Sequence, residues 1–146
     1  MIAIETNILV YAHRREPEFH PQAAQLLAHL AEGHQPWAIP WPCIFEFFSV
    51  ATNPRIWNAA ASTPDQATNQ IEAWLSSPSV RTLSEPRGFF SILEATLRNG
   101  RMRGGIVHDA RVAALCLAHG VEELLTRDRD FRLIPQLKTR DPFAAR

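Results

Sequence analysis

The sequence predicts an α/β fold: a three-layer α/β/α sandwich with a short parallel sheet of four to five strands. Two observations lead to this prediction. Short apolar segments alternate along the chain with longer segments whose apolar residues have helical spacing. The segments between successive strands are long enough to hold a helix, and a crossover of that kind joins parallel strands. Because helices then cover both faces of the sheet, three layers follow.

The first half of the chain is expected to hold two strands and three helices. Short apolar runs at residues 1–4 and 37–40 are predicted strands. The helix over 20–33 opens with a proline, which the first helical turn tolerates, and ends at a glycine. The helix over 42–53 ends before a proline, which disfavours helical geometry in the residue that precedes it. The helix over 63–76 opens with a Thr-Pro-Asp-Gln capping box.

The second half of the chain is expected to complete the sheet. Residues 80–83 are the third predicted strand, and a proline opens the next helix, over 86–100, which a glycine closes. A strongly apolar helix is predicted over 106–119, followed again by a glycine. Residues 123–126 are the fourth predicted strand, and residues 137–139 are a fifth.

The composition is typical of one globular domain, assigned to residues 1–146. Apolar residues make up 46% and charged residues 21% of the chain, which argues against disorder. No apolar run approaches the length of a membrane span and no secretory signal is visible, so we expect no membrane association and a cytoplasmic location. The formal net charge of zero does not by itself indicate a nucleic-acid partner. Cys43 and Cys116 are interpreted as buried free thiols.

Polar side chains follow two of the predicted strands, at the point where each strand ends. Glu5, Thr6 and Asn7 come directly after the first strand, and Thr126 and Asp128 leave the fourth in the same way. In parallel sheets the active site lies beyond the carboxyl ends of the strands. These side chains are therefore expected to line a crevice.

Acidic residues are the main candidates for chemistry. Five stand out by position: Glu5, Glu46, Asp109, Asp128 and Asp130. A carboxylate within the run Ile-Phe-Glu-Phe-Phe is expected to carry a desolvation cost unless it is paired or binds a cation. Ordinary alternatives exist: Glu46 could point outward or pair with Arg55, Asp109 could complement a helix dipole, and the last two could be turn residues.

The five acids together favour a metal site. Carboxylates that converge at one sheet edge repel each other unless a cation compensates them, and oxygen ligands suit Mg²⁺ or Mn²⁺. Such a site suits in-line attack of a metal-activated water on a phosphodiester. The chain has neither a Walker lysine loop nor a glycine-rich dinucleotide turn, which disfavours a nucleotide cofactor.

Four segments, in order and at the usual spacing, resemble PIN-domain nucleases over essentially the whole chain. They are Ile-Glu-Thr-Asn-Ile-Leu-Val-Tyr-Ala at 4–12, Glu46 followed by Val-Ala-Thr-Asn-Pro-Arg at 50–55, Val-His-Asp-Ala-Arg-Val-Ala-Ala at 107–114 and Leu-Thr-Arg-Asp-Arg-Asp-Phe at 125–131. Within that family the sequence is most similar to VapC-type toxins of bacterial type II toxin–antitoxin pairs.

The resemblance implies a Mg²⁺- or Mn²⁺-dependent endoribonuclease that cuts RNA such as tRNA or rRNA. It also implies a homodimer that a VapB-like antitoxin inhibits. The acidic core carried over from the family is Glu5, Glu46, Asp109 and Asp128, with Asp130 as an accessory acid. Glu5, Asp109 and Asp128 are the implied metal ligands, and Thr6, Asn7 and Thr126 are implied to orient carboxylates or water.

Position 5 departs from the family, which nearly always has aspartate there. Glutamate places the carboxylate roughly 1.5 Å further out, and a misplacement of about 1 Å in an active site can reduce the rate on the order of 10²-fold. The glutamate is natural with a compensating shift of the metal, natural with weak activity, or an engineered change that spares the host. The alternative function is a catalytically impaired PIN-fold binding module that acts through an antitoxin-bound, operator-binding complex.

Basic and aromatic residues complete the prediction. Arg101, Arg103, Arg127 and Arg129 flank the acidic motifs and are predicted to bind RNA phosphates, with solvated loop charge as the alternative. The chain also holds more large aromatic side chains than a small core needs: Trp37, Trp41, Phe45, Phe47, Phe48, Trp57 and Trp74. Most are expected in the core, and some against a dimer partner or an antitoxin helix.

Overall fold

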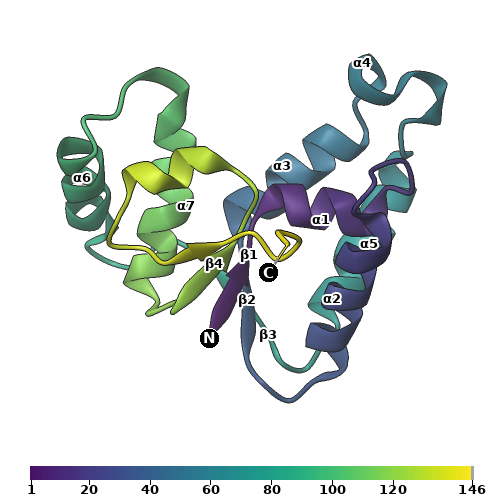
Figure 1. Ribbon diagram of the computed structural model, residues 1–146, viewed down its shortest axis with the longest axis horizontal. Coiled ribbons are helices and arrows are strands. Elements are labelled where there is room, and N and C mark those ends of the chain that lie inside the picture. The colour runs from purple at the N-terminus through teal and green to yellow at the C-terminus, as the bar shows by residue number, and fades with distance from the viewer. Residues whose placement is uncertain (146) are drawn as a thin grey trace.

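The computed structural model of the protein describes residues 1–145 and contains one five-stranded sheet (Figure 1). The strands are β1 (Ile2–Ile4), β2 (Trp37–Pro40), β3 (Val80–Leu83), β4 (Glu123–Leu125) and β5 (Thr139–Arg140). Their order across the sheet is β3-β2-β1-β4-β5, and every pairing is parallel. The predicted fold class is therefore confirmed, while the expected domain end at residue 146 lies outside the described residues.

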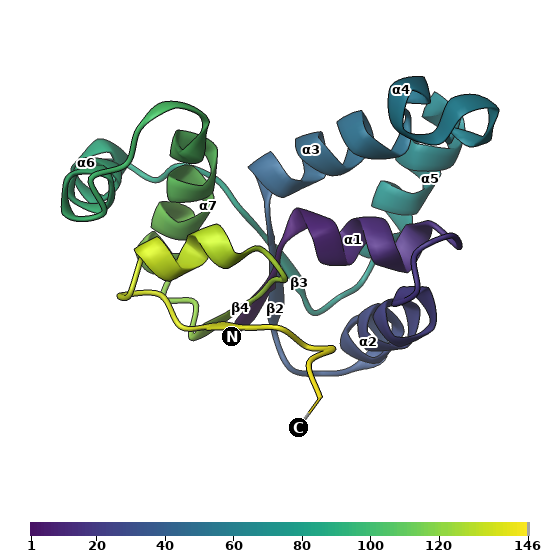
Figure 2. The ribbon, with the colours of Figure 1, turned by 45° about the horizontal axis from the view of Figure 1, so that its top comes forward.

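Helices lie on both sides of this sheet. They are α1 (Thr6–His13), α2 (His20–Glu32), α3 (Trp41–Ala51), α4 (Pro54–Trp57), α5 (Pro64–Leu75), α6 (Phe89–Asn99) and α7 (Val107–Ala118). The described residues also contain three short 3-10 helices: η1 (Asn58–Ala60), η2 (Gly104–Ile106) and η3 (Arg129–Leu133). Helices α6 and α7 cover one side, and α1, α2 and α5 the other (Figures 1 and 2).

Most predicted boundaries agree with the structure to within one or two residues, and two need correction. The helix expected to open at residue 86 begins at Phe89, because Gly88 has a left-handed φ of 81° that interrupts helical geometry. The fifth strand is Thr139–Arg140 instead of 137–139, since Leu137 is buried in the core before the chain reaches the sheet edge. Helices α1 and α4 were not among the elements predicted from the sequence.

The core holds the apolar faces of these elements against the sheet. Trp37 and Phe47 are fully buried, and the Phe47 ring packs edge-on to Trp74 with centroids 4.8 Å apart. Full burial of a large apolar side chain stabilises a fold by about 1.5–3 kcal/mol. Cys43 and Cys116 are buried free thiols, as expected. This packing fixes α3 and α7, which carry two of the five acids.

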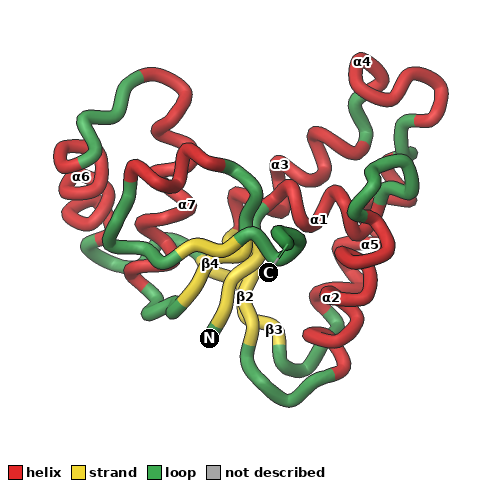
Figure 3. The backbone as a smooth tube through the Cα atoms, viewed as in Figure 1, coloured by secondary structure: helices red, strands yellow, loops and turns green. Residues whose placement is uncertain are grey.

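The carboxyl ends of β1 and β4 lie side by side, although these strands come from opposite ends of the sequence. Ile4 of β1 pairs with Leu125 of β4, and the Glu5 amide donates to the Leu125 carbonyl over 3.1 Å. In the tube view the loop that leaves β4 lies beside the start of α1 (Figure 3). None of the helices in the described residues is long and apolar enough to span a lipid bilayer.

Candidate active site

Glu5 lies at the junction between β1 and α1, where it is 6% exposed. Its Oε2 accepts hydrogen bonds from the Asn7 amide at 3.2 Å and from the Thr126 hydroxyl at 3.1 Å, so it caps the N-terminus of α1. Burial raises the pKa of Glu5 from 4.5 to about 7, and the negative charges of Glu46 and Asp128 add to that increase. The two hydrogen bonds oppose the increase without cancelling it.

A continuous set of hydrogen bonds runs from Glu5 to the loop after β4. The hydroxyl of Thr126, which donates to Glu5, accepts from the Asp128 amide at 2.9 Å. Asp128 Oδ1 in turn accepts from the Asp130 amide at 2.9 Å, and this bond caps η3. We call this set the Glu5 relay. Because each member fixes the next, the buried carboxylate of Glu5 sets the position of Asp128.

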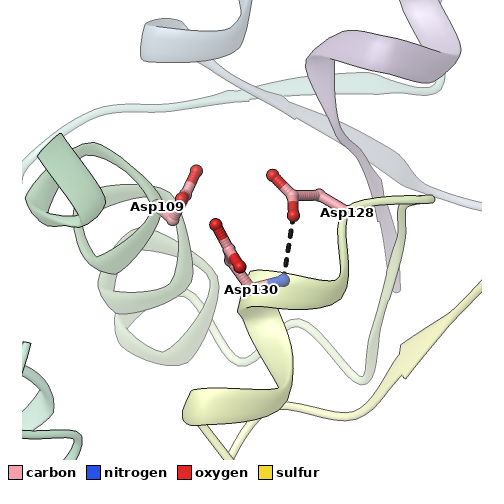
Figure 4. Close-up of side chains that lie close together, drawn as sticks. All are labelled: Asp109, Asp128 and Asp130. Carbon is pink, nitrogen blue, oxygen red and sulfur yellow. Dashed lines mark hydrogen bonds between the residues drawn. The ribbon is translucent and has the colours of Figure 1, made fainter.

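Three carboxylates converge at the end of the Glu5 relay. Asp109, Asp128 and Asp130 each offer an oxygen, and these oxygens all lie within 4.8 Å of one another. Figure 4 shows Asp109 on α7 facing the two acids from the loop and 3-10 helix after β4. Burial, together with the negative charges of Asp128 and Asp130, raises the pKa of Asp109 from 3.8 to about 6. We call this group the acidic triad.

Glu46 reaches the same region from α3. Its Oε2 accepts from the Thr6 hydroxyl at 2.9 Å, which ties α3 to the start of α1. The residue is exposed, so the expectation that it carries a desolvation cost is wrong: its neighbours Ile44 and Phe47 turn into the core while Glu46 faces outward. No ion pair with Arg55 occurs within the part of the chain that the structure describes.

Two neighbouring cavities connect these acids. The larger has a volume of about 630 Å³ and includes Glu46, Asp109 and Asp128 in its lining. The smaller, of about 200 Å³, is lined by Glu5, Thr6 and Asn7 among others, and Glu46 and Asp128 line it too. The structure thus brings to one place the acids that the sequence analysis selected from distant segments.

The composition of the closest carboxylate group differs from the expected ligand set. The sequence analysis grouped Glu5 with Asp109 and Asp128, whereas in the structure Asp130 completes the acidic triad. Glu5 Oε2 accepts hydrogen bonds from the Asn7 amide and the Thr126 hydroxyl, and the assignment of Glu5 as a metal ligand stays a prediction. Thr6 and Thr126 hold Glu46 and Glu5, respectively.

The four predicted phosphate-binding arginines have different environments. Arg127 donates to Asp141 over 3.0 Å and lies over the Phe19 ring, 4.0 Å from its centroid, so it is engaged within the protein. Arg101 and Arg103 are exposed but are absent from the lining of the two acidic cavities. Arg129 lines a third cavity together with Asp128.

The lining of the larger cavity also includes residues that were not selected as site residues from the sequence, among them Phe45, His108 and Arg111. Arg111 forms an ion pair with Glu85 at the cavity edge. Closeness in sequence to Asp109 was the available signal for His108 and Arg111. Adjacency to Glu46 was the signal for Phe45, which had been counted only among the surplus aromatic residues.

Comparison with known proteins gives concordant findings. The family described as "PIN domain" matches residues 2–137. Ribonuclease VapC48 of Mycobacterium tuberculosis is 31% identical over 140 residues, which cover 96% of each chain. Ribonuclease VapC43 of the same organism is 28% identical over 142 residues, covering 97% of this chain and 95% of the relative.

Solved structures show the same fold. The crystal structure of Mycobacterium tuberculosis VapC20, described as a sarcin-ricin loop cleaving toxin, superposes with a TM-score of 0.66 at 16% identity and covers 90% of this chain and 93% of that one. VapBC2 from Rickettsia felis, bound to a DNA fragment from its promoter, matches with a TM-score of 0.64 at 21% identity and covers 96% and 98%.

Proposed function

This chain belongs to the PIN domain family, among its VapC-type members, and on that premise we propose that it is a divalent-metal-dependent endoribonuclease, the toxin of a toxin–antitoxin pair. The observation that carries the proposal is the acidic triad, placed beside Glu46 at the edge of a cavity. The curated relatives that cover almost the whole chain are named ribonucleases.

The acidic triad has the chemistry of a site for Mg²⁺ or Mn²⁺. Its donors are carboxylate oxygens alone, which hard divalent cations prefer, whereas Zn²⁺ favours histidine or cysteine ligands. The raised pKa of Asp109 reflects burial and the repulsion of neighbouring acids, which a cation would relieve. We assign Asp109, Asp128 and Asp130 as the residues that hold the ion.

The remaining polar residues act around that centre. A bound divalent cation supplies positive charge that acidifies the attacking water and stabilises the charge that develops on the phosphate. Glu46 uses Oε2 to accept from Thr6, and its other oxygen, which has no partner among the described residues, orients water in the cavity. Glu5 is a positioning residue, because it acts on Asp128 through Thr126.

We further propose that a VapB-like antitoxin restrains this activity and that the toxin is a homodimer. A structural neighbour is a VapBC complex on promoter DNA, which supports the first part. The homodimer rests on the family resemblance, and light scattering of the purified protein tests it. The alternative of a binding module that does not cut RNA is not favoured, since the curated relatives are named ribonucleases.

Incubation of the purified protein with total bacterial RNA tests the nuclease directly. We expect cleavage with Mg²⁺ or Mn²⁺, loss of cleavage with EDTA, and loss in Asp109→Asn and Asp128→Asn variants that keep the circular dichroism spectrum of the parent. Undiminished cleavage by both variants, or cleavage that EDTA leaves intact, contradicts the assignment.

A further inference from the structure

An aromatic ring is exposed at the edge of the acidic cavity. Phe45 is 61% exposed and lines the cavity that also holds Glu46, Asp109 and Asp128. A single exposed phenylalanine is ordinary on a protein surface. Four other large apolar side chains are exposed in the described residues, Ile56, Phe90, Val107 and Leu133, and none of them lines this cavity.

The Phe45 ring is supported from within its own helix. Trp41 lies one turn earlier on α3, and the two ring centroids are 5.9 Å apart with planes inclined by 31°. Trp41 is itself partly buried against the core. The contact with Trp41 restricts the Phe45 ring. The side chain therefore loses little conformational freedom when a planar group packs on it.

The rest of the cavity suits a nucleotide. Its volume of about 630 Å³ lies within the range of small-ligand sites, about 300–1,000 Å³. His108 and Arg111 lie on the same lining and add polar groups to it, although Arg111 is paired with Glu85. Phe45 lines the same cavity as Glu46, Asp109 and Asp128, and the last two belong to the acidic triad assigned to phosphodiester chemistry.

We propose that Phe45 stacks on the RNA base adjacent to the scissile phosphate and so helps to bind the substrate. This inference rests on the proposed nuclease function and deepens it. A base within a duplex is covered on both faces by its neighbours, whereas an unpaired base offers a free face to an aromatic side chain. Phe45 is thereby a residue that contacts the substrate.

The test begins with RNA. Cleavage sites are mapped in total bacterial RNA, and a fluorescent oligonucleotide that carries a mapped site is cleaved by the unmodified protein, Phe45→Ala and Phe45→Trp. Phe90→Ala is the matched control, since Phe90 is 70% exposed on α6 and lies outside the cavity. We expect Phe45→Ala to lower kcat/KM at least about tenfold, mainly through KM, and expect Phe45→Trp to retain activity.

An abasic site next to the cleaved bond distinguishes stacking from other effects. The abasic oligonucleotide lacks the base, so we expect Phe45→Ala and the parent to cleave it at equal rates. The effects of removing the base and removing the ring are then not additive, as a double-mutant cycle shows for two groups in contact. Two results overturn the inference while the nuclease assignment stands. One is that Phe45→Ala lowers kcat/KM by the same factor on the intact and the abasic oligonucleotide. The other is that kcat/KM of Phe45→Ala on the intact oligonucleotide stays within about twofold of the parent value.

A change in oligomeric state is the remaining outcome. If Phe45→Ala shifts the mass measured by light scattering and Phe90→Ala does not, the ring is a protein contact and the inference fails. Absence of any metal-dependent cleavage by the unmodified protein overturns the proposed function and this inference together.

Discussion

Burial of Glu5 makes the stability of the protein depend on pH in a predictable direction. The folded-state pKa of Glu5 is raised from 4.5 to about 7, so the folded protein holds a proton there that the unfolded chain has released. Stability from this group is fully present below about pH 4.5, is lost as pH rises through about 7, and stays lost above that. Each pKa unit corresponds to about 1.4 kcal/mol, which gives about 3 kcal/mol in total.

The substitution Glu5→Gln removes this dependence, because the amide has nearly the same shape and does not ionise. Its oxygen can still accept from the Asn7 amide and the Thr126 hydroxyl. We therefore expect Glu5→Gln to unfold at a higher temperature than the parent at about pH 8, by about 10 °C for a domain of this size, and by much less at about pH 5.

Thermal unfolding followed by circular dichroism in EDTA measures the difference without interference from bound metal. Glu72→Gln is a suitable control, since Glu72 is exposed on α5 and undergoes the same chemical change. Equal gains for Glu5→Gln at both pH values, or an equal response of Glu72→Gln, would falsify the reasoning, because burial of the charge at position 5 would then not be the cause.

Three more predictions concern the site. Mn²⁺ affinity measured by calorimetry should weaken roughly tenfold per pH unit below about 6, because Asp109 must release its proton before it binds the ion. Asp109→Asn should abolish both the tight binding and this pH dependence. An affinity of the parent that does not change with pH would refute the prediction. Glu5→Asp should raise RNA cleavage several-fold, since it restores the family's shorter side chain; a lower rate would mean that Glu5 is adapted to this site. Thr126→Val should break the Glu5 relay, destabilise the fold by about 1–3 kcal/mol in urea unfolding and reduce cleavage, whereas Thr126→Ser should retain both; an active, stable valine variant would contradict the role of the relay.

The order of strands and helices could be predicted from the sequence because those signals are local. Alternating apolar runs, the capping box before α5 and the glycine after α2 each act within a few residues. Four of the candidate acids could be predicted for a related reason: Glu5, Asp109, Asp128 and Asp130 follow strands or open a helix, and those positions have defined places in a parallel sheet.

The remaining features depend on contacts between distant segments, which no local pattern specifies. The closest carboxylate group contains Asp130 and not Glu5, and Glu5 accepts a hydrogen bond from Thr126, 121 positions away in sequence. Arg127 is drawn to Asp141 instead of standing free. Glu46 is exposed because the opposite face of α3 packs on the core. The apolar residues on both sides of Glu46 in the sequence do not indicate which face that is.

The pairing of β1 with β4 has a consequence during synthesis of the chain. The ribosome makes Glu5 first and its partners after β4 last, about 120 residues later, an interval on the order of ten seconds at typical elongation rates. A nascent or truncated polypeptide that stops before β4 carries Glu5, Glu46 and Asp109 but neither Asp128 nor Asp130. The acidic triad can therefore form only after the segment that follows β4 has been made.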